Sequence, residues 1–147
     1  MSDDAPRTAD LVEIQALCSR YMAYTSQFIE DRWLDVFTPD VVYTAFGTPY
    51  SLDRFPALLA AAPRGQFIGN APVVEFVDAD TATGMQHFVF FDQQTHAMRL
   101  GWYSDEYRRT AHGWRIRRRS TTFMRKHGGF DSGHQHDPLA EPQEGAK

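Results

Sequence analysis

Residues 81–124 constrain the fold most, because they contain three long runs typical of β-strands. The runs cover about residues 81–91, 96–109 and 114–124, and short polar or glycine-containing turns separate them. Such direct connections predict consecutive antiparallel strands. Their length and aromatic content favour a strongly curved sheet, over which the upstream segments are expected to close.

Apolar residues occupy both faces of the first of these strands. Alternation places Met85 and Val89 on one face and Phe88 and Phe90 on the other. A sheet with two apolar faces is covered on both sides. We therefore expect helices on one side and a second copy of the chain on the other, giving a homodimer.

The segments before residue 81 alternate between helical and strand patterns. Asp10 is expected to open the first helix, with Glu13 as its capping-box partner. Pro39 stops a second helix, and Pro72 marks an edge or a bulge in a strand. The predicted helices are residues 10–27, 29–37 and 52–62, and the predicted strands are residues 41–46 and 66–77.

These patterns predict a single domain of the α+β class, covering residues 10–126. Residues 1–9 and 127–147 have no periodic apolar pattern and are predicted to be flexible. Helices packed on the concave face of a bent antiparallel sheet form a cone. A cone lined by aromatic side chains is typical of a pocket for a small hydrophobic molecule.

The charge pattern gives no case for a nucleic-acid partner, because the net charge is −4. Alternation places Arg115, Arg117 and Arg119 on one strand face, which we interpret as solvated. Asp105 and Glu106 are neighbours, so they face opposite sides, and one is expected to pair with an arginine across the sheet. The lone Cys18 fits a buried position. No membrane segment or targeting signal is recognised, and a cytoplasmic protein is expected.

The sequence offers no cofactor motif. It has no glycine-rich phosphate loop. His134 and His136 lie in the predicted tail, where such a pair favours only adventitious metal binding. We expect neither a metal nor a cofactor.

Three segments carry a resemblance to a known family: LVEIQALCSRYMAY, WLDVFTPDVVY and GWYSDEYRRTAHGWRI. Over about residues 10–125 the chain resembles the SnoaL-like branch of the NTF2-like fold. This group includes scytalone dehydratase, ketosteroid isomerase, polyketide cyclases and the lindane dehydrochlorinase. The resemblance implies an NTF2-like cone, with three N-terminal helices on a strongly curved antiparallel sheet. It is more specific for fold than for function, since this fold hosts many chemistries.

Many members of that family use a histidine–aspartate dyad beside the cone. The resemblance places the family aspartate at Ser26 and the family histidine at Gln66. Neither side chain ionises at ordinary pH. The usual dyad chemistry of the family is therefore not carried over to this chain.

Other residues are candidates for a replacement site. His87 and Asp92 are the candidate acid–base groups, although they differ in parity and His87 also fits a core or dimer-face position. Tyr43 and Tyr103 are expected to lie on strands that meet in the cone and to hydrogen-bond a substrate oxygen. The candidate substrate-binding residues are Tyr24, Ser26, Gln66, Asn70 and Arg99.

Two functions fit these observations. The first is a cofactor-independent lyase or isomerase, acting by proton abstraction or elimination on a hydrophobic aromatic or polycyclic small molecule. The second is a non-catalytic ligand-binding or dimeric scaffold domain that has lost the dyad. A more remote alternative is the small subunit of a ring-hydroxylating oxygenase, which has the same fold but is expected to be longer.

Overall fold

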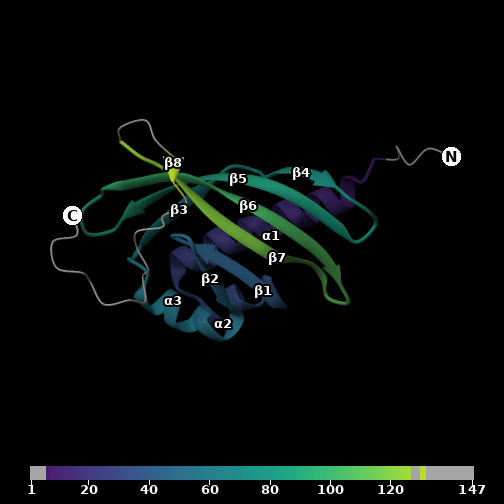
Figure 1. Cartoon of the computed structure of the whole chain (residues 1–147), viewed down its shortest axis with the longest axis horizontal. Coiled ribbons are helices and arrows are strands. Elements are labelled where there is room, and N and C mark those ends of the chain that lie inside the picture. The colour runs from purple at the N-terminus through teal and green to yellow at the C-terminus, as the bar shows by residue number, and fades with distance from the viewer. Residues whose placement is uncertain (1–5, 127–129, 132–147) are drawn as a thin grey trace.

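The computed structural model describes residues 6–126 and 130–131 of the chain (Figure 1). Helices precede a long meander of strands, in the predicted order. The elements are α1 (Thr8–Gln27), α2 (Glu30–Leu34), β1 (Phe37–Ala45), β2 (Thr48–Ser51), a short 3₁₀ helix (Leu52–Arg54), α3 (Phe55–Ala61), β3 (Gly65–Gly69), β4 (Val73–Phe76), β5 (Thr81–Asp92), β6 (Met98–Thr110), β7 (Gly113–Met124) and β8 (Phe130–Asp131).

The three long strands β5, β6 and β7 form the centre of the sheet, as predicted. The strand order is β2-β1-β7-β6-β5-β3, with β4 also paired to β5 and β8 paired to β7. Every pair is antiparallel except β1 with β7, which run parallel. The sheet is therefore mixed, whereas the sequence predicted an antiparallel one. Hairpins force antiparallel pairing only between strands that are directly connected, and β1 is far from β7 in the sequence.

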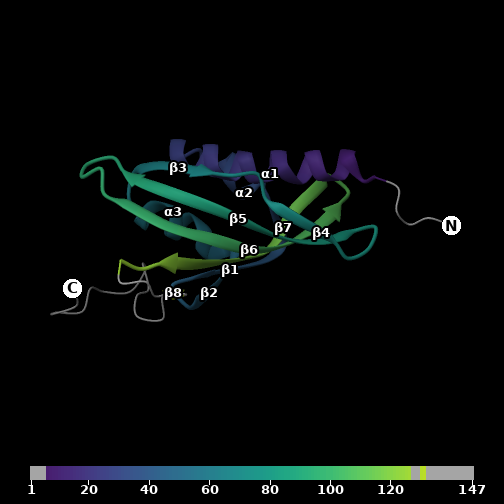
Figure 2. The same ribbon diagram turned by 90° about the horizontal axis from the view of Figure 1, so that it is seen from above.

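The sheet is strongly curved, and α1 lies along one of its sides (Figures 1 and 2). α2 and α3 lie beside β1 at one end of α1. The inward side chains of the sheet and of α1 form one buried core, which includes Cys18 as predicted. Trp33, Phe37 and Phe55 continue this core through edge-to-face and tilted ring contacts, with centroids 4.9 to 5.5 Å apart. The architecture is the predicted α+β cone.

Several boundaries differ from the prediction. α2 is only five residues long, and Phe37 already belongs to β1. Phe37 pairs with Ile116 of β7, and Ile116 donates its backbone N–H to Val36 (2.9 Å). Residues 36–37, which were expected to be helical, are therefore held against β7 by strand pairing.

The predicted strand 66–77 is instead two strands, β3 and β4, which both pair with β5. They separate next to Pro72, which has no N–H to donate to a ladder. β2 lies between a predicted strand and a predicted helix, in a segment for which the sequence predicted neither. Phe46 and Gly47 both have positive φ angles (53° and 78°), which suits a tight two-residue hairpin between β1 and β2.

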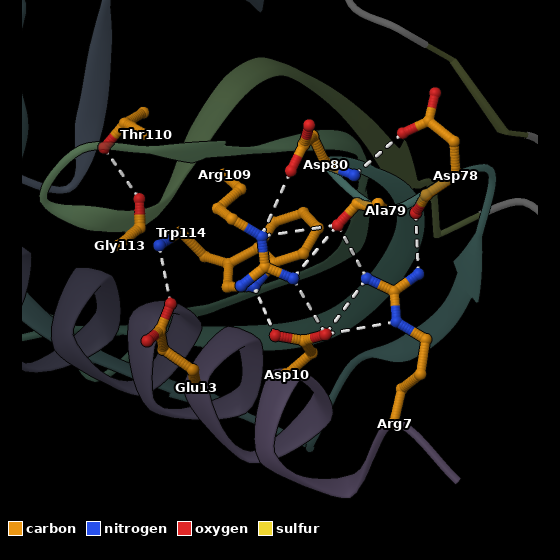
Figure 3. A network of polar contacts seen from close by, with 10 residues as sticks. All are labelled: Arg7, Asp10, Glu13, Asp78, Ala79, Asp80, Arg109, Thr110, Gly113 and Trp114. Carbon is orange, nitrogen blue, oxygen red and sulfur yellow. Dashed lines mark hydrogen bonds and ion pairs between the residues drawn. The ribbon is translucent and has the colours of Figure 1, made fainter. Parts of the chain in front are cut away.

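The N-terminal flank also departs from expectation. α1 begins at Thr8, two residues before Asp10, and no side chain caps it. The Asp10 carboxylate instead accepts hydrogen bonds from Arg7, from Arg109 (2.9 Å) and from Trp114 Nε1 (3.1 Å) (Figure 3). Glu13 accepts the backbone N–H of Trp114 (2.6 Å) instead of closing a capping box. We call this contact of α1 with the β6–β7 hairpin the N-terminal clamp.

The predicted flexible ends lie largely outside the described residues. Of the predicted flexible tail, residues 130–131 form β8 against β7, and the other residues from 127 to 147 lie outside the described part. Residues 1–5 lie outside it too. None of the helices within residues 6–126 is long and apolar enough to cross a membrane.

Candidate functional site

A β-bulge at Arg117 decides which side chains of β7 enter the cone. In the ladder with β6, Tyr107 pairs with Ile116 and Glu106 pairs with Arg118, so Arg117 is an extra residue. Trp114 and Ile116 are buried before the bulge, and Arg119 is buried after it. The inward parity therefore switches within one strand.

The consequence is a fully buried ion pair. Arg119 is 0% exposed, and its Nε and Nη2 donate to the two carboxylate oxygens of Asp105, each at 2.8 Å. Tyr107 also donates to Asp105 (2.7 Å). This confirms that one of the adjacent carboxylates pairs with an arginine across the sheet. The expectation that Arg119 lies on a solvated face is wrong, because the bulge turns it inward.

Arg119 has further partners inside the cone. Its Nη2 also donates to Gln86 Oε1 (3.2 Å), and its guanidinium carbon lies 4.3 Å from the ring centre of Tyr21 and 4.0 Å from that of Tyr103. Its Nη1 is buried and has no hydrogen-bond partner in the described part of the chain. Burial alone would lower the pKa of Arg119, but the Asp105 carboxylate holds it well above its ordinary value. The arginine is therefore charged at all ordinary pH values.

Two tyrosines that the sequence selected lie beside this pair. The Tyr43 hydroxyl is 3.2 Å from Thr121 Oγ1 and accepts from the Tyr21 hydroxyl at 3.4 Å. Tyr103 is buried and stacks on Phe88 with centroids 4.6 Å apart. Burial raises the pKa of both Tyr43 and Tyr103, so both remain protonated donors. We call Arg119, Asp105, Tyr21, Tyr43 and Tyr103 the arginine–tyrosine cluster.

Cys18 also touches the cluster. Its Sγ lies 3.8 Å from Arg119 Nη2 and 3.5 Å from the Tyr107 hydroxyl. Burial raises the pKa of the thiol to about 11. Cys18 is therefore a neutral packing residue and not a nucleophile.

The two candidate acid–base groups do not face the cluster. His87 is exposed on the outer face of the sheet, with its ring 5.6 Å from that of Trp102. Its neighbours Gln86 and Phe88 face inward, so the expected place of His87 in the cone is wrong. Asp92 ends β5 and accepts the N–H groups of Gln94 and Thr95, which lower its pKa. It shapes the β5–β6 turn.

The two family dyad positions meet at the junction of α1 and β3. Ser26 Oγ donates to the Met22 carbonyl (2.8 Å) and accepts the N–H of Phe67 (2.9 Å), so it links α1 to β3. The adjacent Gln66 is exposed. The positions are thus close in the fold, although neither residue can supply the dyad's chemistry.

The other substrate-binding candidates are dispersed. Tyr24 lines a groove between α1 and α2 with Arg20, Arg32 and Asp35. Asn70 extends the β3–β5 ladder and accepts Gln86 Nε2 on its carbonyl (2.9 Å). Arg99 lies near the β5–β6 turn, at the opposite end of the inner face from the N-terminal clamp.

Arg119, Tyr21, Tyr107 and Gln86 were missed as site residues. The parity switch was the available signal: Trp114 and Ile116 are apolar at even positions, whereas Phe123 is apolar at an odd one. A change from even to odd apolar positions within one strand indicates a bulge between them. Across residues 6–126 and 130–131, no group of three or more His, Cys, Asp or Glu residues is arranged to hold a metal. His134 and His136 are outside those ranges.

Comparison with known proteins identifies the family of the chain. A family model described as "SnoaL-like domain" matches residues 6–120. The uncharacterized protein Rv2910c of Mycobacterium tuberculosis is 34% identical over 130 residues, covering 78% of this chain and 85% of that protein.

Solved structures show the same fold. Rv3472, a protein of unknown function from M. tuberculosis, superposes with a TM-score of 0.74 at 25% identity, covering 81% of this chain and 79% of that one. Hexachlorocyclohexane dehydrochlorinase LinA-type3 from Novosphingobium barchaimii gives a TM-score of 0.67 at 20% identity, covering 80% and 88%. The length of the family match and the identity to Rv2910c place the chain: it belongs to the SnoaL-like domain family.

Proposed function

We propose that this protein is a cofactor-independent lyase or isomerase that acts on a hydrophobic, aromatic small molecule at the arginine–tyrosine cluster. The reaction class is inferred from the family. The arginine–tyrosine cluster is proposed as the reactive site, because the family dyad is missing.

One observation carries the proposal: Arg119 Nη1 is a charged, buried donor without a hydrogen-bond partner among the described residues, 6–126 and 130–131. Leaving such a donor unsatisfied is costly, and native proteins rarely do so without a reason. A substrate oxygen that enters the cone would satisfy it. Tyr43 is the member of the cluster whose side chain is partly exposed, and the other four are buried.

The chemistry that suits these groups is the stabilisation of a developing oxyanion. When a C–H bond next to a carbonyl is broken, the electron pair moves onto the oxygen. A fixed guanidinium and two protonated phenols stabilise that charge inside a site of low dielectric. Asp105 is the carboxylate of the cluster and the group that would accept the proton there, although three hydrogen bonds already occupy its oxygens.

The second candidate function is a ligand-binding domain without catalysis. It is favoured by the neutral Ser26 and Gln66 at the dyad positions, and by the outward position of His87. Both functions use the same cone, so they differ in turnover and not in the class of ligand.

Exchange of carbon-bound hydrogen in D₂O distinguishes them, because it detects proton abstraction without knowledge of the product. We would incubate the protein with aryl ketones such as 1-tetralone and 2-tetralone and follow the α-hydrogens by NMR. Exchange faster than in buffer is expected for the wild type. Tyr43→Phe removes one oxyanion donor and should lower kcat by about 10²-fold with a smaller change in KM.

Tyr24→Phe is the matched control, since Tyr24 lines a groove away from the cluster. It should retain the wild-type rate. Equal exchange with and without protein across the ketone panel would instead favour the ligand-binding function.

A further inference from the structure

Arg99 belongs to the same face of the sheet as the arginine–tyrosine cluster. In the β5–β6 ladder it pairs with Phe90, which is 3% exposed and faces inward. From Arg99, every second residue of β6 continues along the inner face through Gly101 and Tyr103 to Asp105. Arg99 and Asp105 are six residues apart, which corresponds to about 20 Å along a strand.

Aromatic side chains fill the inner face between these two charged positions. Phe88 stacks on Tyr103, Phe67 packs on Phe90 with centroids 4.7 Å apart, and Phe123 approaches Phe88 at 6.4 Å. A Cβ at Gly101 would collide with the Thr122 carbonyl oxygen and would lie 3.2 Å from the Phe88 ring. Because Gly101 has no side chain, the Phe88 ring can pack over it on this face. We call these residues the aromatic strip.

Arg99 lies at the rim of this face without an ion-pair partner among residues 6–126. The residue is exposed at the rim of the inner face, and yet partial burial lowers its pKa. Its guanidinium carbon lies 5.8 Å from the Phe90 ring centre, and no carboxylate in residues 6–126 forms an ion pair with it. Asp92 opposes the pKa shift from a distance, but its carboxylate is used by the N–H groups of the β5–β6 turn.

We propose that the ligand of this cone is an aromatic acid, whose carboxylate binds Arg99 while its rings lie on the aromatic strip. This inference rests on the proposed function, because it extends the same site by naming the substrate class. A guanidinium matches a carboxylate with two parallel hydrogen bonds, and a partly desolvated one gains most from such a partner. The rings would then extend from Arg99 along the inner face toward the arginine–tyrosine cluster.

The test is a binding measurement that needs no turnover. The probes are 6-hydroxy-2-naphthoic acid and its methyl ester, which share the rings and the hydroxyl but differ in charge. Isothermal titration should show that the wild type binds the acid about tenfold or more tightly than the ester. Arg99→Gln should lower the affinity for the acid about tenfold and leave that for the ester unchanged.

Arg118→Gln is the matched control, because Arg118 is exposed on the outer face of β7. It should bind both probes as the wild type does. Equal affinity for acid and ester, or an Arg99→Gln variant that keeps the preference for the acid, would overturn this inference and leave the proposed function standing. A wild type that binds neither probe would also overturn this inference, whereas the proposed function is tested separately by the exchange of ketone hydrogens.

Discussion

At the residue scale, the buried Arg119–Asp105 pair has the largest consequence for stability. Removing one member of a fully buried pair leaves an uncompensated charge, which typically costs about 3–5 kcal/mol. We predict that Arg119→Met lowers the free energy of unfolding by about that amount, measured by urea denaturation. The double variant Arg119→Met/Asp105→Leu should recover much of the loss, because it removes both charges.

Arg118→Met changes a neighbouring arginine on the outer face and should alter stability by no more than about 0.5 kcal/mol. A double variant as unstable as the single one would show that the pair does not act through its charges.

The candidate site was predictable from the sequence only where strand alternation holds. Tyr43 and Tyr103 were correctly expected on strands that meet at the cone, and both contact Tyr21 there. His87 was misplaced because apolar residues occupy both faces of β5, so composition does not reveal which face is inside. Arg119 was misplaced because one extra residue, Arg117, inverts the parity of β7 before it.

At the element scale, the N-terminal clamp fixes α1 to the β6–β7 hairpin. Hydrogen bonds from Arg109, Trp114 and Arg7 hold the pKa of Asp10 well below its ordinary value. A depressed carboxylate pKa stabilises the fold above the unfolded-state pKa of about 3.9, and the stabilisation disappears as the pH falls through the folded-state pKa.

We therefore predict that Asp10→Asn lowers the melting temperature at neutral pH. The difference from wild type should be constant above about pH 5 and should shrink as the pH falls below about 4. Thermal unfolding followed by circular dichroism across this range measures it. Asp53→Asn, in the exposed 3₁₀ helix, is the control, and a difference that does not depend on pH would contradict the role of the charge.

The elements themselves were predicted with uneven accuracy for a physical reason. The long strands β5 to β7 follow from local turn chemistry, so their bounds were close. β1 and α2 are set by pairing with β7, which joins residues far apart in the sequence. Local propensity around residues 34–40 does not contain that information.

At the scale of the whole molecule, the outer face of the sheet carries an apolar row. Ile68, Val89, Leu100 and Met124 lie side by side on β3, β5, β6 and β7. Ile68, Leu100 and Met124 are 51%, 40% and 43% exposed, and His87 and Trp102 belong to the same face. Rows of this kind on one face are typical of an interface.

We propose that a second copy of the chain covers this row, burying on the order of 2,000 Å² or less in a homodimer. Leu100→Lys should convert the dimer to a monomer, because two charges would then be buried near each other, and light scattering after size exclusion measures the mass. Val12→Lys changes an exposed apolar residue on α1 and should leave the mass unchanged. A wild type with a monomer mass at every concentration would refute the proposal.

The extra residue at Arg117 also gives a way to compare relatives from their sequences. Two inward residues of a regular strand are separated by an even number of positions, whereas Ile116 and Arg119 are three positions apart. A relative that keeps this odd interval between a buried aliphatic residue and an arginine is expected to hold a cation inside its cone. A relative with an even interval would carry that arginine on its outside, so a single-codon insertion or deletion is enough to gain or lose a charged interior.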